Sequence, residues 1–141
     1  MSYLEMVKKQ LLVDESLKTK LYRDTVGKLT IGVGRNIEDV GVSVDEALFM
    51  LDNDIAAAEK LAQRLLGTAF DDLNDVRKAV VINMSFNMGP KFGLFKNTLG
   101  FIASKQYDQA ATEMGKSLWA KQVGERSDRL IKMMRTGVLP S

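Results

Sequence analysis

The sequence predicts a mainly helical α+β fold, in which a small β-containing N-terminal lobe is joined by a long helix to a helical C-terminal lobe. A regular apolar stripe over residues 44–66 predicts the long helix. Residues 15–36 contain glycines at positions 27, 32 and 34, which interrupt any helical pattern and indicate tight turns and a short strand. The length of 141 residues and the hydrophobic content of 45% suit one domain with a real core.

Composition excludes several classes of function. The chain has no cysteine and no histidine, which removes disulfides, thiol chemistry, Ser–His and Cys–His nucleophiles and the commonest zinc ligand. A net charge of +2 is too small to predict a nucleic-acid partner. The N-terminus lacks the continuous apolar core of a signal peptide, and no stretch approaches a membrane-spanning length. We therefore expect a protein of the cytoplasm, without stable membrane association.

The first elements follow from capping and turn patterns. Ser2 and Glu5 form a possible capping box for a helix over residues 3–14. Residues 20–33 are β-like around a hairpin turn at residues 24–28, and the strand after the turn is expected over residues 30–34.

Helices account for the rest of the chain. Ser43 and Glu46 repeat the capping-box spacing before the helix of residues 44–66, which Gly67 should end. Further helices are predicted over residues 73–88, 98–105, 107–116 and 125–136. The first of these is apolar on nearly all sides, as in the centre of a bundle, and Gly89-Pro90 should end it. Asn97 is the expected cap of the second.

Two carboxylates and a hydroxyl in the N-terminal part could carry acid–base chemistry. Glycosidic bonds are hydrolysed by a pair of carboxyl groups, one protonated and one ionised. Glu15, at the end of an apolar helix, is the better candidate for partial burial and therefore for the acid, and Asp24, in a polar turn, for the solvated, ionised group. The hydroxyl of Thr30 could hold a water molecule. From the residues alone, Glu15 could equally be a helix-end charge, Asp24 a turn residue and Thr30 an ordinary strand residue.

A family resemblance narrows these alternatives. The run DESLKTKLYRDTVGKLTIGVG, residues 14–34, resembles the active-site signature of phage-type (T4-lysozyme-like) lysozymes of glycoside hydrolase family 24. The resemblance continues in order through DVRKAVVINMSFNMG (75–89), FKNTL (95–99) and the KSLW, ER and RTG elements around Trp119, Arg126 and residues 135–137. It therefore covers nearly the whole chain.

The resemblance implies a lysozyme-like fold, with a small lobe of about residues 15–43, a linking helix of about 44–66, and a helical lobe of about 67–141 plus the N-terminal helix. Peptidoglycan would bind between the lobes and be cut at the β-1,4 bond between N-acetylmuramic acid and N-acetylglucosamine. Glu15 would be the general acid, while Asp24 and Thr30 would place the attacking water in an inverting reaction. Arg126 resembles the arginine that forms an ion pair with the catalytic glutamate.

Positions matching the family's sugar-binding residues are Phe86, Asn87 and Thr98. Each has a structural alternative: Phe86 as core, Asn87 as a helix-end residue and Thr98 as the first residue of a helix. Trp119 resembles a tryptophan of the helical core.

The chain departs from the family pattern in two places. Family members often carry histidine after the TIGxG run, where this chain has Arg35. That histidine is a structural partner, so we expect activity to survive with a different local pairing. The segment between Gly34 and Ser43 is short, which predicts a reduced β lobe.

The resemblance implies a monomeric phage endolysin that needs no metal or organic cofactor. It would accumulate in the host cytoplasm and reach the wall after a holin opens the inner membrane. The alternatives are a wall-binding module without turnover, a virion-associated or prophage lysozyme, and an interaction protein built on a helical bundle.

Overall fold

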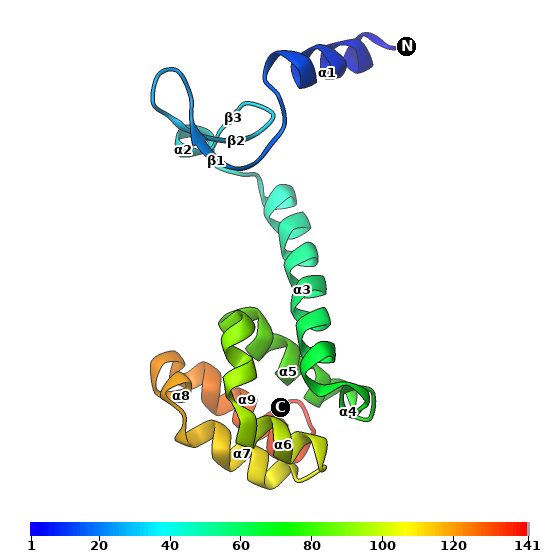
Figure 1. The fold of residues 1–141 in the computed structure, drawn as a ribbon, viewed down its shortest axis with the longest axis vertical. Helices are drawn as coiled ribbons and strands as arrows, with labels where there is room; N and C mark the ends of the chain where they lie inside the picture. The colour runs from blue at the N-terminus through cyan, green and yellow to red at the C-terminus, as the bar shows by residue number, and fades with distance from the viewer. Residues whose placement is uncertain (141) are drawn as a thin grey trace. The chain divides into compact units, whose positions relative to one another are not determined.

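The computed structural model describes residues 1–140 and divides into two compact units, Met1–Phe49 and the chain from Met50 onward. The boundary falls inside helix α3 (Val44–Leu66). Unit 1 also contains α1 (Tyr3–Asp14), β1 (Lys18–Arg23), β2 (Leu29–Gly32), β3 (Arg35–Asn36) and α2 (Ile37–Val40) (Figure 1). Unit 2 contains α4 (Thr68–Asp71), α5 (Asp75–Met88), the 3-10 helix η1 (Gly89–Leu94), α6 (Lys96–Ala103), α7 (Tyr107–Lys116), α8 (Leu118–Val123) and α9 (Glu125–Thr136). This content confirms the predicted mainly helical α+β fold.

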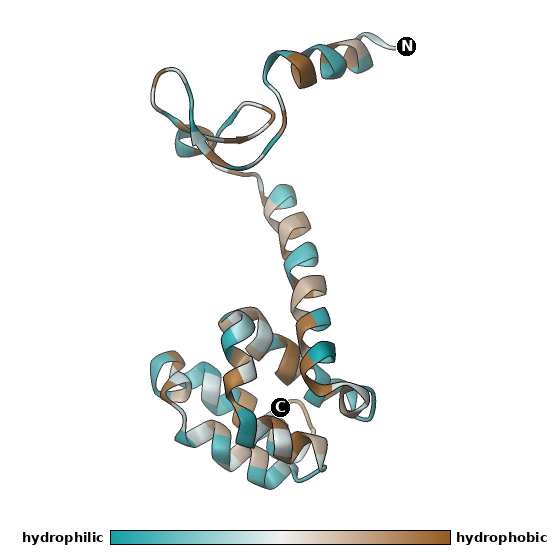
Figure 2. Cartoon of the chain, viewed as in Figure 1, coloured by the Kyte–Doolittle hydropathy of each residue, from teal (hydrophilic) through white to brown (hydrophobic). Residues whose placement is uncertain are grey.

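Helix α1 begins and ends where the sequence predicts. The Ser2 hydroxyl accepts a hydrogen bond from the Glu5 N–H at 3.2 Å, and the C-cap residue is Glu15. Ser16 then adopts φ 62°, a left-handed conformation that turns the chain out of the helix. Apolar and charged residues alternate along α1 (Figure 2). Within residues 1–140, no helix combines the length and apolarity needed to cross a bilayer.

A three-stranded antiparallel sheet of order β1-β2-β3 forms the body of unit 1. The turn between β1 and β2 is the predicted one. The strand expected over residues 30–34 is shorter than predicted, because β2 ends at Gly32 and a third strand begins at Arg35. Gly32, the last residue of β2, and Gly34 have φ of 73° and 68°, outside the extended region, so the chain turns there.

Arg35 connects the sheet to the start of α3. Its guanidinium donates to both carboxylate oxygens of Glu46, at 2.9 and 2.6 Å, and to the Gly41 carbonyl at 3.0 Å. Glu46 also accepts the Ser43 N–H at 2.8 Å, and the Ser43 hydroxyl accepts the Glu46 N–H at 3.1 Å, which confirms the predicted capping box. The new local pairing expected for Arg35 is therefore a bidentate ion pair with a helix-capping glutamate.

This pairing predicts a pH dependence of stability. The hydrogen bonds from Arg35 and from the Ser43 N–H lower the pKa of Glu46 from 4.5 to about 2. The pKa of Glu46 is therefore lower in the folded state than in the unfolded state, and ionised Glu46 stabilises the fold. This stabilisation is complete above about pH 4.5 and is lost as the pH falls towards 2. The difference in melting temperature between wild type and Glu46→Gln should therefore shrink as the pH is lowered from 6 to 2.5. A pH-independent difference for Glu46→Gln would contradict the pairing.

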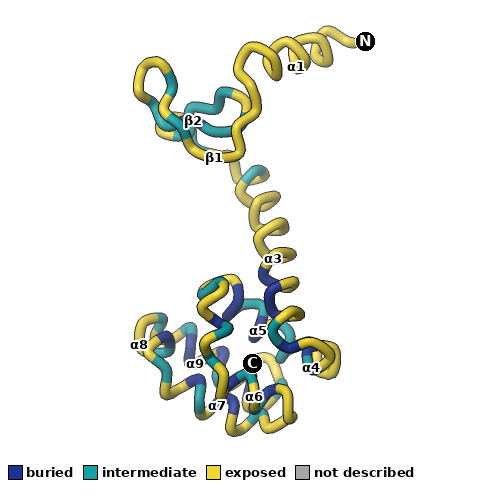
Figure 3. Tube along the Cα trace, in the orientation of Figure 1, coloured by how far each residue is buried: buried dark blue, intermediate teal, exposed yellow. Residues whose placement is uncertain are grey.

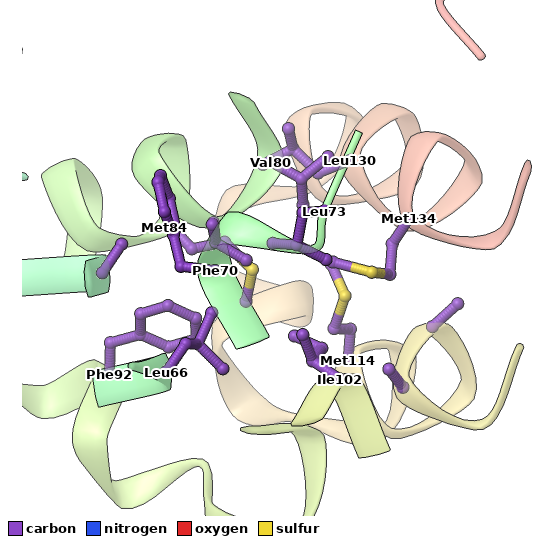
Figure 4. Close-up of a cluster of buried hydrophobic side chains, with 14 of the residues drawn as sticks. Leu66, Phe70, Leu73, Val80, Met84, Phe92, Ile102, Met114, Leu130 and Met134 are labelled. Atoms are coloured by element: carbon purple, nitrogen blue, oxygen red, sulfur yellow. The ribbon is translucent and has the colours of Figure 1, made fainter. Parts of the chain in front are cut away.

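The hydrophobic core lies in unit 2. Buried residues gather on the inward faces of its helices, whereas unit 1 is mostly half-buried or exposed (Figure 3). One cluster of buried side chains joins α3, α4, α5 and η1 to α6, α7 and α9 (Figure 4). The first four of these elements contribute Leu66, Phe70, Val80, Met84 and Phe92. Helix α5 contributes Val80, Val81 and Met84 to the core. It is not apolar on nearly all sides as predicted, because Asp75, Phe86 and Asn87 on the same helix are exposed.

Differences from the sequence prediction concern short elements. Asn97 is not the cap of α6, because the helix begins at Lys96 and Phe95 precedes it. Gly89 ends α5 as predicted, but the chain continues as η1, since proline is tolerated in the first turn of a helix. The short helices α2, α4 and α8 were not predicted, because a four- to six-residue helix carries too little periodicity to detect.

Candidate active site

Glu15 lies against the turn between β2 and β3. A Cβ atom built on Gly34 would be 2.8 Å from Glu15 Oε2 and 2.9 Å from its Cδ, so the carboxyl group rests on the Gly34 backbone. Glu15 is exposed, as is every residue of α1, so the partial burial expected from the sequence is wrong. The end of α1 and the sheet of unit 1 therefore bring this carboxyl group to the segment that follows Thr30.

Asp24 both builds the β1–β2 turn and presents a carboxylate. Its Oδ1 accepts the N–H groups of Val26 at 3.0 Å and Lys28 at 2.9 Å, and its own N–H donates to the Lys28 carbonyl at 2.9 Å. Within residues 1–140, the hydrogen bonds to this carboxylate all end on Oδ1. Oδ1 therefore stabilises the turn, and Oδ2 can accept a hydrogen bond from a water molecule.

Thr30 lies on β2, the central strand, and its side chain is only 2% exposed. Its hydroxyl donates to the Lys28 carbonyl at 2.9 Å. Because that bond uses the only hydroxyl proton, Thr30 can interact with water only as an acceptor.

Arg126, in unit 2, is held by an asparagine that sequence analysis did not single out. Its Nε and Nη2 donate to Asn83 Oδ1 at 3.0 and 2.5 Å. Beside it, Phe86 is 46% exposed, so the core alternative for Phe86 does not describe it. A largely apolar hollow of about 420 Å³ is lined by Leu51, Ile55, Ala79, Ile82, Asn83, Phe86 and Arg126.

Asn87 is fixed by the core tryptophan. Trp119 is 5% exposed, in agreement with its predicted core role, and its Nε1 donates to Asn87 Oδ1 at 2.8 Å. Both residues line a second hollow of about 630 Å³, together with Lys91, Ser117 and Gln122. Thr98 lies in the first turn of α6 and is 3% exposed, so it has little surface to offer a sugar.

The structure thus places Glu15, Asp24 and Thr30 on unit 1, and Phe86, Asn87, Thr98 and Arg126 on unit 2. The ion pair between Arg126 and Glu15 stays a prediction, as does the assignment of the N-terminal helix to the helical lobe. Two partners were not predicted from the sequence: Asn83, which binds Arg126, and Gly34, which contacts Glu15. Each of the two contacts a residue far away in the sequence, so no local sequence pattern predicts the contact.

The profile of the family described as "Phage lysozyme" matches residues 13–135. The chain belongs to the phage lysozyme family. It is 33% identical to "Probable T4-type lysozyme 1" and 30% identical to "Probable T4-type lysozyme 2", both from Dictyostelium discoideum, with 94% of this chain and 95% of each relative covered. It is also 26% identical, over its whole length, to 29% of the "Pre-baseplate central spike protein Gp5" of Enterobacteria phage T4.

Membership of the phage lysozyme family confirms the predicted enzyme class. The protein is a glycoside hydrolase of the lysozyme type, and its substrate class is peptidoglycan. The alignments with the Dictyostelium lysozymes extend over 162 positions, whereas this chain has 141 residues. These alignments therefore include positions at which this chain has no residue.

Proposed function

We propose that this phage lysozyme is a muramidase that hydrolyses the β-1,4 bond between N-acetylmuramic acid and N-acetylglucosamine, with Glu15 as the general acid. The observation that carries the proposal is the location of Glu15. This residue is exposed at the end of α1, and its carboxyl group lies against Gly34 in the β2–β3 turn of the unit that also contains Asp24 and Thr30. An exposed carboxyl group and a second carboxylate on one small unit are the minimum that glycoside hydrolysis requires.

In the proposed reaction, Glu15 donates its proton to the glycosidic oxygen as the bond from that oxygen to the muramic acid C1 breaks. A water molecule attacks C1 from the opposite face, and Asp24 accepts its proton through the carboxylate oxygen that the turn leaves free. Thr30 is only 2% exposed, so its role would be confined to accepting a hydrogen bond from a water molecule that reaches its hydroxyl. Inversion needs room for the water, so the carboxyl groups should be roughly 6.5–9.5 Å apart in the productive complex.

We propose that Phe86 and Asn87 bind the glycan. The exposed side of the Phe86 ring offers a flat apolar surface to a sugar. Trp119 occupies Asn87 Oδ1, which leaves the amide N–H₂ free to donate to a sugar oxygen. Thr98 would take part only through the edge of the small hollow that it lines with Asn97 and Ser117. Arg126 would act as the charged partner of Glu15.

The biological role that we propose is lysis of the host cell by an endolysin that acts as a monomer and reaches the wall through a holin-dependent step. A second candidate role is that of a lysozyme domain in a virus particle. The similarity to the phage T4 central spike protein favours this second role.

Product analysis tests the reaction. Digestion of purified peptidoglycan should create new reducing ends of N-acetylmuramic acid, and NMR of the first products should detect the α anomer, because inversion of a β bond yields it. New reducing ends of N-acetylglucosamine would contradict the assigned bond. Wall binding without new ends would instead favour a non-catalytic binding module, and a β anomer would contradict the inverting mechanism.

A further inference from the structure

Gly34 makes an unusually close approach to the side chain of Glu15. The distances from an ideal Cβ at position 34 are 2.8 Å to Oε2, 2.9 Å to Cδ and 3.0 Å to Cγ of Glu15. All three nearest atoms belong to that one side chain. A real Cβ atom does not approach other heavy atoms this closely, so the observed position of the carboxyl group requires a residue without a side chain at position 34.

The other glycines with positive φ in unit 1 lack this feature. Gly27, Gly32 and Gly41 have φ of 85°, 73° and 68°, and a Cβ on any of them would meet no heavy atom within 4 Å. Their conformation alone explains why glycine occurs there. Gly34, with φ of 68°, shares the conformational requirement and adds the contact with Glu15.

We propose that Gly34 is a positioning residue for Glu15, in that the space left by its missing side chain holds the carboxyl group against the β2–β3 turn. Glutamate has three rotatable side-chain bonds, and Glu15 is exposed at a helix end, so neighbouring side chains do little to limit its position. The Gly34 backbone supplies one fixed surface. The proposal rests on the proposed role of Glu15 as general acid.

Alanine at position 34 should disturb catalysis more than folding. The clashing atoms are the end of a flexible, exposed side chain, which can swing into solvent. Alanine at position 34 is also destabilised by the positive φ, but the same backbone strain affects Gly32→Ala. The two variants should therefore lose similar amounts of thermal stability, and only Gly34→Ala should displace the acid.

The experiment compares wild type, Gly34→Ala and Gly32→Ala. On short glycan strands, we expect kcat of Gly34→Ala to fall on the order of 100-fold with little change in KM, because a displaced proton donor costs turnover rather than binding. Gly32→Ala should keep kcat close to wild type. Equal kcat values for the two variants would overturn the proposal.

A second measurement does not depend on activity. Nuclear Overhauser effects between the Glu15 Hγ and Gly34 Hα protons should be present in wild type and in Gly32→Ala. The corresponding effect from Glu15 Hγ to the Hα of residue 34 should be lost in Gly34→Ala. Absence of the effect in wild type would overturn the positioning proposal even if Glu15 is the acid. If the effect is present but turnover does not depend on Glu15, the proposed function fails while the contact stands.

If Gly34→Ala does not fold, the double variant Gly34→Ala, Glu15→Ala distinguishes a clash with Glu15 from a requirement of the backbone. Glu15→Ala removes every side-chain atom that the new Cβ would meet, so it should restore folding to the double variant. A double variant that also stays unfolded, while Gly32→Ala folds, would overturn the proposal, because Gly34 would then be required by the backbone itself.

Discussion

Glu15→Gln is expected to lower turnover of peptidoglycan by about 10²–10⁴-fold, the range that a general acid contributes. The amide has nearly the same shape as the carboxyl group and can rest on Gly34 in the same way, but it has no acidic proton to donate. Glu15 is exposed, and its side chain makes no hydrogen bond within residues 1–140. The melting temperature and the binding of glycan strands should therefore remain close to wild type.

Glu5→Gln is the matched control for this prediction. It makes the same chemical change on the same helix, at an exposed position near the other end of α1. Its rate of release of reducing ends should equal that of wild type. Near-normal turnover in Glu15→Gln would remove Glu15 from the mechanism, and comparable losses in both variants would point to the overall charge of α1.

Asp24→Asn and Asp24→Ala are expected to share a large loss of activity but to differ in stability. Asparagine keeps an oxygen that can accept the N–H groups of Val26 and Lys28, and it suits the turn, but it cannot take a proton from water. Alanine also removes the acceptor for these two N–H groups. Each net hydrogen bond is worth about 1 kcal/mol, so Asp24→Ala should be the less stable variant.

Activity and chemical denaturation of both variants test this separation. If Asp24→Asn is as active as wild type, the carboxylate serves only the turn. If Asp24→Asn is as unstable as Asp24→Ala, the charge itself is needed to form the turn, and its catalytic role cannot be deduced from the loss of activity.

Much of the candidate site follows from local patterns. The end of α1 at Glu15 follows from the periodicity of the helix, and the location of Asp24 in a turn follows from the Asp24–Lys28 run. Their chemical pairing does not follow, because an acidic residue at a helix end or in a turn is common in any protein. The ordered resemblance to a known family along the chain made the catalytic interpretation specific, and membership of that family confirms the enzyme class.

The sequence by itself determined the bounds of α1, α3, α7 and α9, since capping residues and apolar spacing act over three or four positions along the chain. It did not determine the third strand or the β2–β3 turn. Only the tertiary structure brought Gly34 to Glu15, Asn83 to Arg126 and Asn87 to Trp119. These partners lie 19 to 43 positions apart in the sequence. No repeating local pattern links residues so far apart, and their contacts exist only once helices and strands have packed.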